Sequence, residues 1–280
     1  MAPHTLRASQ FNLEKTLNSG QVFHWVPHQG GFAGTIAAEL AYIKQDGQTL
    51  SFAGVDESSV MRYFALDHPL EEILNSFPND PAMKLAKEYS AGIRIIRQPA
   101  WECLATFITS AMKQIFHIRA ISHAIRHRFG RRLQCDDLCA FSYPGPEILA
   151  AAQLDQLIEC KLGFRARNLL STARMIAEGE VDLEALRKLS TEQARHTLLQ
   201  LPGVGEKIAN CVLLFAYERF DAVPIDVWIA RVLSEVYFKG RSGISMAELK
   251  MFAENYFGAY AGYAQQYLFH HWRLTYRKTR

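Results

Sequence analysis

The segment from residue 190 to residue 217, STEQARHTLLQLPGVGEKIANCVLLFAY, constrains the fold more than any other part of the chain. Ser190 followed three residues later by Gln193 is a capping box, which predicts a helix that runs to about Leu201. The dipeptide Pro-Gly ends that helix, and the small residues of PGVG allow a tight turn before a second, apolar helix begins near Glu206. The segment therefore predicts a helix-hairpin-helix.

The hairpin residues Gly203, Val204 and Gly205 have a composition that suits contact with a phosphate group. Small residues let backbone N–H groups approach a phosphate oxygen, and the unpaired amides at the start of the second helix favour an anion there. Such contacts hold a DNA backbone without reading its sequence. An ordinary turn between two helices has the same pattern, so the hairpin alone leaves both interpretations open.

Two charged residues stand in this apolar stretch, Lys207 just after the turn and Asp226 within VPIDV. A lysine in the first turn of a helix, among apolar neighbours, is disfavoured as the ammonium form, and a neutral amine is a nucleophile. An isolated lysine at such a position is more often a solvated residue or a plain phosphate contact. Asp226 precedes VWIARV and is expected to cap that helix. The second helix rises about 16 Å and the link after it reaches about 26 Å, so Asp226 can return beside Lys207.

The rest of the chain shows two patterns of apolar residues, one in each part, and together they predict an α+β protein of two domains. Short alternating runs between residues 22 and 52, separated by the turn signals PHQGG and QDGQ, predict an antiparallel sheet. Helical spacing of apolar residues follows. We therefore expect an N-terminal antiparallel sheet domain with helices over residues 1–92, and an all-helical region over residues 93–280 that contains the hairpin motif at about 190–217.

Net charge, cysteine content and hydrophobic runs limit the classes of function that the chain can have. The formal net charge of +3 is too small to imply a polyanionic partner, but residues 117–132 hold five arginines, three histidines and no acid, and the chain closes with HHWRLTYRKTR. Five cysteines, an odd number, argue against a disulfide framework, and their spacing predicts no metal site. No apolar run approaches the roughly 18 residues of a membrane span, and MAPHTLRASQ lacks a secretory signal. We expect a cytoplasmic protein, associated with the nucleoid if bacterial, that acts as a monomer without a cofactor.

The motif LPGVGEKIANCVLLFA followed by AVPIDVWIARV resembles the helix-hairpin-helix and following aspartate of the base-excision DNA glycosylases. The lysine form resembles the bifunctional members, which also cleave the DNA strand. Four further motifs, NSGQVFHW, ECLATFITS, LGFRAR and GAYAGYAQQYLF, extend the resemblance over nearly the whole chain, and it is to the 8-oxoguanine DNA glycosylases.

This resemblance implies a reaction on double-stranded DNA that contains an oxidised purine. Lys207 would attack the sugar carbon that bears the base, form a Schiff base and permit β-elimination, while Asp226 would stabilise positive charge on the sugar. The base must leave the stack and enter a pocket. The resemblance assigns that pocket to the Gly20 carbonyl, which would accept the N7 hydrogen that 8-oxoguanine has and guanine lacks, and to Cys211, Gln265 and Phe269.

The resemblance also assigns contacts to the DNA strand opposite the lesion, and here the chain departs from the family pattern. Phe164 stands in place of a tyrosine that wedges into the DNA in the family. At Arg165 the chain retains the family's arginine, which pairs with the orphaned base, the base left opposite the flipped lesion. Met112 replaces an asparagine, His117 replaces a second arginine, and Trp228 replaces a histidine that contacts phosphate. A thioether is a weak hydrogen-bonding group, so we expect relaxed dependence on the opposite base.

Two other functions stay open at this stage. A monofunctional glycosylase for alkylated bases would use only the aspartate and a water molecule, and Lys207 argues against it. A non-catalytic DNA-binding protein would use the hairpin alone, and the pairing of Lys207 with Asp226 argues against that.

Overall fold

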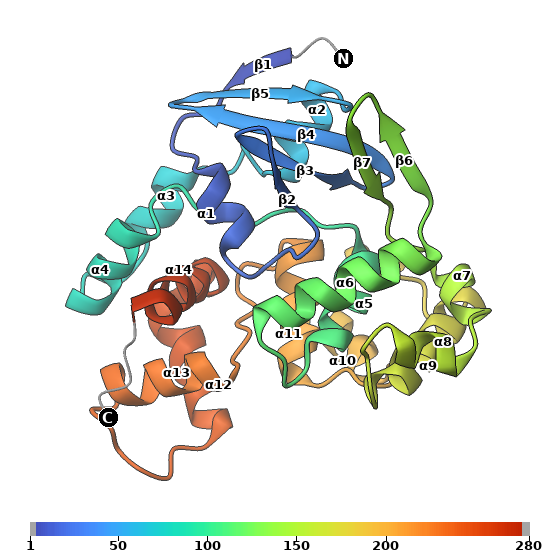
Figure 1. Ribbon diagram of the computed structural model, residues 1–280. Coiled ribbons are helices and arrows are strands. Elements are labelled where there is room, and N and C mark those ends of the chain that lie inside the picture. Colours follow the sequence, from blue (N-terminus) through green and yellow to red (C-terminus); the bar gives the residue numbers. More distant parts are fainter. Residues whose placement is uncertain (1–3, 276–280) are drawn as a thin grey trace.

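The computed structural model describes residues 4–275 and begins with a five-stranded antiparallel sheet. Its strand order is β1 (His4–Arg7), β5 (Thr49–Ala53), β4 (Glu39–Asp46), β3 (Gly31–Ile36) and β2 (Val26–His28) (Figure 1). The predicted antiparallel sheet is therefore confirmed, and β1 adds a strand from residues that carried no strand prediction. Ile43 pairs with Phe52 across β4 and β5, and both side chains are fully buried. Burial of alternate residues on one face explains why this segment forms strands.

α-Helices make up most of the remaining described chain. Those before the predicted domain boundary are α1 (Leu13–Asn18), α2 (Glu57–Tyr63), α3 (Leu70–Asn75) and α4 (Pro81–Tyr89). Those after it are α5 (Ala100–Ser110), α6 (Ile115–Phe129), α7 (Pro146–Ala150), α8 (Leu154–Glu159), α9 (Arg165–Ala177), α10 (Thr191–Leu199), α11 (Glu206–Tyr217), α12 (Val227–Val232), α13 (Met246–Phe257) and α14 (Ala261–Thr275). No helix in this described part of the chain is long and apolar enough to cross a membrane.

One element departs from the all-helical expectation for residues 93–280. Strands β6 (Arg132–Cys135) and β7 (Leu138–Phe141) form a hairpin that follows α6 and extends to the sheet domain, where it packs against β3 and β4 (Figure 1). The turn contains Asp136 in a left-handed conformation, with φ of 52°. Aspartate tolerates that conformation better than most residues, so the Asp136–Asp137 pair is a turn signal that the sequence analysis did not use.

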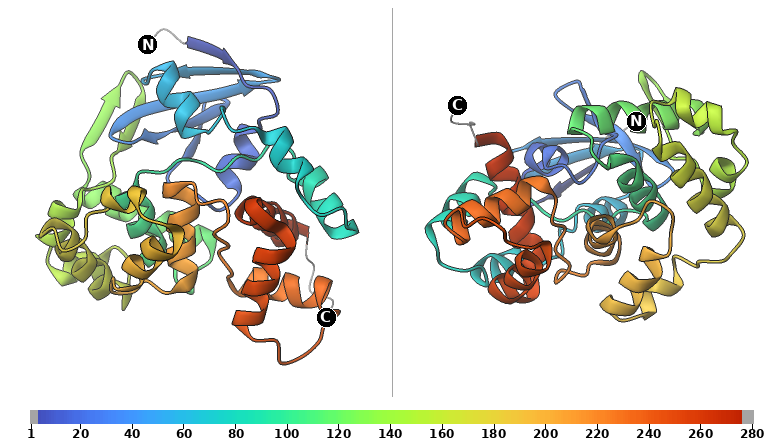
Figure 2. Two further views of the ribbon diagram at one scale, coloured as in Figure 1. Left: turned by 180° about the vertical axis from the view of Figure 1, so that it is seen from behind. Right: turned by 90° about the horizontal axis from the view of Figure 1, so that it is seen from below.

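The buried side chains form two clusters. One lies against the sheet and includes Ile43, Phe52 and Ile96. The larger cluster fills the helical part, and it includes Leu70, Ile73 and Met83 from α3 and α4. Figure 2 shows α3 and α4 beside the C-terminal helices, and α4 contacts α14. Both helices precede the domain boundary expected at residue 92, yet they pack in the helical core. The division of the chain into two domains at that residue remains a proposal.

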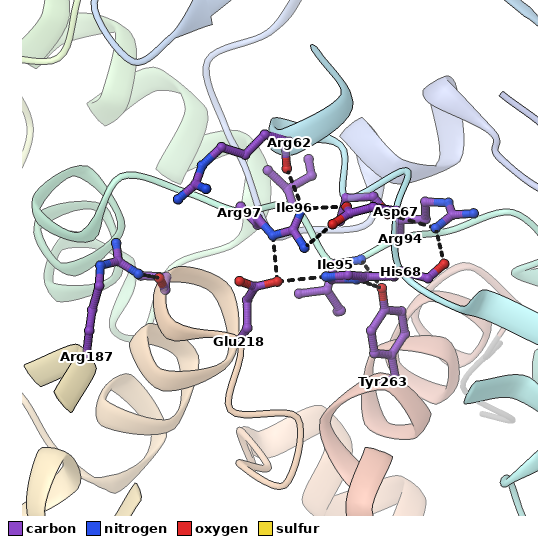
Figure 3. Close-up of polar contacts among 12 residues, drawn as sticks. Arg62, Asp67, His68, Arg94, Ile95, Ile96, Arg97, Arg187, Glu218 and Tyr263 are labelled. Atoms are coloured by element: carbon purple, nitrogen blue, oxygen red, sulfur yellow. Dashed lines mark hydrogen bonds and ion pairs between the residues drawn. The ribbon is translucent and has the colours of Figure 1, made fainter. Parts of the chain in front are cut away.

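A polar network ties α11 to both parts of the molecule at its C-terminal end (Figure 3). Glu218 follows α11, and its Oε1 accepts hydrogen bonds from Arg97 Nε at 2.6 Å and from His68 Nε2 at 2.7 Å. The other ring nitrogen of His68 lies 2.7 Å from the Tyr263 hydroxyl on α14. The hydrogen bonds from His68 and then Arg97 lower the pKa of Glu218. The network fixes α11 relative to α14 and to the segment that joins sheet and helices.

Candidate active site

A cleft of about 900 Å³ opens between the start of α11, the start of α12, the loop from α5 to α6, and α14. Lys207 and Asp226 both line it, as do Gly20, Phe269 and Trp228. The fold thus brings together residues that lie up to 249 positions apart, from Gly20 to Phe269. Both side chains line the same cleft, and within residues 4–275 no ion pair joins Lys207 to Asp226.

Lys207 stands in the first turn of α11, and its amine contacts two residues of α5. The Lys207 Nζ atom lies 5.0 Å from the centroid of the Phe107 ring and donates to Ser110 Oγ at 3.4 Å. The Phe107 ring in turn stacks on Phe215 of α11, with ring centroids 5.5 Å apart. A hydrogen bond of 3.4 Å is long and an amine–ring contact is weak, so both contacts to the amine are weak. The sequence did not indicate a role for Ser110 or Phe107, although both lie within the ECLATFITS motif.

Asp226 occupies the N-cap position of α12, as predicted. Its Oδ1 accepts a hydrogen bond from the Ile229 backbone N–H at 2.8 Å, and its backbone is extended. The side chain is half-buried in the wall of the cleft. Because the cap fixes one carboxylate oxygen, the group has a defined position at the cleft and remains partly open to solvent.

The predicted helix-hairpin-helix is confirmed in α10, α11 and the turn between them. Ser190 and Gln193 form the complete capping box. Gly203 has φ of 81°, a conformation that favours glycine, and the added Cβ of any other residue would lie 2.8 Å from the Asn168 side chain. Gly203 and Gly205 are exposed, whereas Val204 is buried and its N–H donates to Leu201 O. Gly205 caps α11 without a side chain, so the start of this helix stays open to an anion.

The expected base-reading residues fall into two groups. Gly20 and Phe269 line the cleft and touch one another, since a Cβ added at Gly20 would lie 3.0 Å from Phe269 Cε1. Cys211 and Gln265 are buried behind this surface, with exposed fractions of 3% and 5%. The Gln265 Oε1 atom has no hydrogen-bond partner among the described residues. Burial raises the pKa of the Cys211 thiol to about 11 and the neighbouring Lys207 opposes that rise, so the thiol is protonated and close to the amine.

The residues expected to face the opposite strand lie around the loop from α5 to α6. Met112 is 92% exposed and has φ of 55°, His117 is exposed, and Phe164 is 63% exposed. Arg165 is buried, and its guanidinium lies 4.2 Å from the Phe164 ring centroid. Its Nε donates to Ala111 O at 2.7 Å and its Nη1 to Leu162 O at 3.2 Å. These bonds occupy donors that sequence reasoning assigned to an orphaned base.

Trp228 follows Asp226 and forms part of the cleft wall with an exposed fraction of 40%. The guanidinium of Arg231 lies 5.5 Å from its ring centroid. An indole has a single N–H donor, so this position provides a large apolar surface beside the carboxylate.

The comparisons with known proteins agree with this geometry. The family description "8-oxoguanine DNA glycosylase, N-terminal domain" matches residues 5–104. The structure of MBOgg1 in complex with a low-affinity DNA ligand is 32% identical, covers 98% of this chain and 96% of that chain, and has a TM-score of 0.93. The Clostridium acetobutylicum 8-oxoguanine glycosylase/lyase, in complex with dsDNA containing cytosine opposite to 8-oxoG, is 27% identical with a TM-score of 0.90 and covers 97% of this chain and 98% of that chain. A probable N-glycosylase/DNA lyase of Methanothermobacter thermautotrophicus is 26% identical over 94% of each chain.

The fold, with its hairpin, the lysine that follows and the capping aspartate, is that of the helix-hairpin-helix DNA glycosylases. Within that class, the match over nearly the whole length of MBOgg1 shows that the chain belongs to the 8-oxoguanine DNA glycosylase family.

Proposed function

We propose that this protein is a base-excision repair enzyme that removes 8-oxoguanine from duplex DNA and then cleaves the strand, with Lys207 as the nucleophile. The observation that carries the proposal is the common cleft of Lys207 and Asp226, in a chain whose relatives are named N-glycosylase/DNA lyase. The hairpin, with its exposed glycines, would hold the DNA backbone while the lesion enters the cleft.

The chemistry follows from the positions of the two side chains. The Lys207 amine, in its neutral form, attacks C1′ of the sugar as the bond to the base breaks, and one of the amine protons leaves with the base. Positive charge develops on the sugar during this step, and the Asp226 carboxylate stabilises it. The C1′–O4′ bond of the sugar ring then breaks as the nitrogen lone pair forms the C1′=N bond of the protonated Schiff base, and O4′ takes up a proton from water. Loss of a proton from C2′ expels the 3′ phosphate oxygen by β-elimination, and water releases the lysine.

The base pocket supports selection of the lesion over guanine. The Gly20 carbonyl would accept the N7–H of 8-oxoguanine, whereas N7 of guanine is itself an acceptor and repels it. Phe269 would stack on the flipped base, and the unpaired Gln265 Oε1 supports a role for that amide at the Watson–Crick edge. Cys211 lies behind the cleft surface in the DNA-free protein, so we propose that it meets the opposite face of the base only after insertion.

We further propose that excision depends only weakly on the opposite base. Met112 and His117 offer few donors, and the Arg165 guanidinium is already bonded to Ala111 O. We also propose that the protein acts as a monomer in the cytoplasm, on nucleoid DNA if the source is a bacterium.

Borohydride trapping tests the central proposal. With a duplex that contains 8-oxoguanine, reduction should join the wild-type protein covalently to DNA, because borohydride reduces a Schiff base to a stable amine. Lys207→Gln should abolish excision and trapping and leave duplex binding nearly unchanged. A monofunctional glycosylase would excise without being trapped, and a non-catalytic protein would do neither. Undiminished excision by the Lys207→Gln variant would refute the assignment of the nucleophile.

A further inference from the structure

The segment of residues 18–21, which runs from the last residue of α1 into the following turn and is called the Gly20 loop below, is held by side chains from distant parts of the chain. Three of its four main-chain carbonyls accept a side-chain hydrogen bond: Asn18 O from Arg273 Nη2 at 2.7 Å, Ser19 O from Gln266 Nε2 at 2.9 Å, and Gln21 O from Gln98 Nε2 at 2.8 Å. Within the described part of the chain, no hydrogen bond reaches the carbonyl of Gly20. The loop thus keeps one main-chain acceptor unused, at the residue that lines the cleft.

A second arginine, from α6, holds the same loop. Arg119 of α6 donates from Nη2 to Asn18 Oδ1 at 2.6 Å. Arg273 of α14 also lies over the Phe269 ring, 5.5 Å from its centroid. Phe269 touches Gly20, whose φ of 89° belongs to the left-handed region that favours glycine. The two arginines therefore connect the Gly20 loop to α6 and to Phe269, which is the other cleft-lining member of the base pocket.

Packing alone does not account for this arrangement. Neither Arg119 nor Arg273 forms an ion pair with an acidic residue in the described chain, and the Nε atom of each is buried without a partner. Burial, and after it the neighbouring charge of Arg119, lowers the pKa of Arg273. Two like charges close together in a half-buried site cost stability. Apolar side chains could fill the same space without that cost, but they could not direct the carbonyls of the loop.

We propose that Arg119, Gln266 and Arg273 are positioning residues that fix the Gly20 carbonyl as the acceptor for the lesion's N7–H. The proposal rests on the proposed function and adds the groups that set its selectivity. A carbonyl distinguishes a donor from an acceptor only if it points at N7, and a peptide unit at a glycine rotates easily. Donors on the flanking carbonyls restrict that rotation, so the acceptor is directed before the base arrives.

The test compares two reactions of the same site. One requires recognition of the damaged base, and the other acts on DNA from which the base is already missing. Excision of 8-oxoguanine requires the Gly20 carbonyl, whereas cleavage of a preformed abasic site uses the Lys207 amine and reads no base. Single-turnover rates of both would be measured on matched duplexes for wild type and for Arg119→Met, Gln266→Met and Arg273→Met. We expect each variant to excise about tenfold more slowly or worse, and to cleave the abasic site within about threefold of wild type.

Three controls separate positioning from other effects. Arg241→Met removes an exposed arginine paired with Glu248, away from the cleft, and should leave both rates near wild type at the same salt concentration. Arg273→Lys keeps a donor for Asn18 O and should recover part of the lost excision. Arg119 acts through the Asn18 side chain, so adding Arg119→Met to Asn18→Ala should lower excision no further.

Each outcome decides the proposal. Equal loss of excision and abasic-site cleavage would mean that these residues only hold the fold or the DNA, and would overturn it. Unchanged excision in all three variants, with an active wild type, would also overturn it and leave the proposed function standing. A wild type that cleaves abasic sites but cannot excise 8-oxoguanine would overturn both. Gln266 is buried, and if its variant does not fold, the half-buried Arg119 variant decides.

Discussion

Asp226 has two roles that substitution can separate, because it caps α12 through one oxygen and carries a charge at the cleft. The Asp226→Asn variant would keep an acceptor for the Ile229 N–H, which now lies 2.8 Å from Oδ1, whereas the Asp226→Ala variant would not. Asparagine and aspartate are about equally good N-caps, and loss of a cap costs about 1 kcal/mol of unfolding free energy. We therefore expect Asp226→Asn to fold with nearly wild-type stability and Asp226→Ala to be less stable by about that amount.

The length of the chain sets the unfolding entropy, and this determines how far the loss of unfolding free energy lowers the melting temperature. Unfolding entropy is about 2 cal/mol/K per residue, so 280 residues give about 0.6 kcal/mol/K, and a loss of about 1 kcal/mol lowers Tm by about 2 °C. Both variants lack the carboxylate charge that would stabilise the sugar cation, a kind of interaction whose loss typically reduces rates about 100-fold or more. The assay pairs single-turnover excision of 8-oxoguanine with a calorimetric melt.

The expected pattern for Asp226→Asn is a wild-type Tm with at least about a 100-fold loss of rate. Asp226→Ala should show a similar loss of rate and the lower Tm. If Asp226→Asn retained excision within about threefold of wild type, the carboxylate charge would not be needed, and the assignment of Asp226 to the chemical step would be wrong.

Three further predictions concern the pocket, the opposite strand and acid stability. Phe269→Ala and Gln265→Ala should weaken binding to lesion-bearing DNA more than binding to undamaged duplex, and equal losses in a binding titration would contradict the pocket assignment. Single-turnover rates on duplexes with C, A, G or T opposite the lesion should agree within about tenfold, and a cytosine preference of about a hundredfold or more would show that other residues read this base. Burial lowers the pKa of His270 to about 4, so the unfolded chain binds its proton first as the pH falls below about 6.5. Stability should therefore decline as the pH falls from about 6.5 towards 4, and His270→Gln should reduce that decline in thermal melts; equal slopes in both proteins would count against it.

Local hydrogen bonding explains which parts of the fold could be predicted from the sequence. The capping box at Ser190 and the cap at Asp226 each involve bonds over three residues, so a short motif contains all the information they need. The β6–β7 hairpin was missed because each strand has only four residues, and it packs against β3 and β4 from the N-terminal part of the chain. Packing of α4 on α14 is likewise a contact between distant segments that no local pattern records.

The same distinction applies to the candidate site. The hairpin pattern itself indicates Lys207 and Asp226, and the resemblance to a family whose motifs hold them adds Gly20 and Phe269. The fold brings all four to one cleft. The neighbours that hold the Lys207 amine could not be found by spacing, since Ser110 lies 97 residues earlier. The Arg165 guanidinium donates to the Ala111 carbonyl, 54 residues earlier in the chain, so the sequence indicates an available guanidinium where the structure has a bonded one.

Helix α11 connects these observations, because its two ends meet different parts of the molecule. Its first turn places Lys207 in the cleft, and Glu218 beyond its last turn is bonded to Arg97 and to His68, which in turn contacts Tyr263 of α14. The same α14 carries Phe269, Gln266 and Arg273, the last two of which hold the Gly20 loop. The amine and the base-reading surface are therefore set by one connected framework of two helices. A reaction that must align a sugar carbon with an amine, while a base is read on the far side of the pocket, requires such a fixed separation.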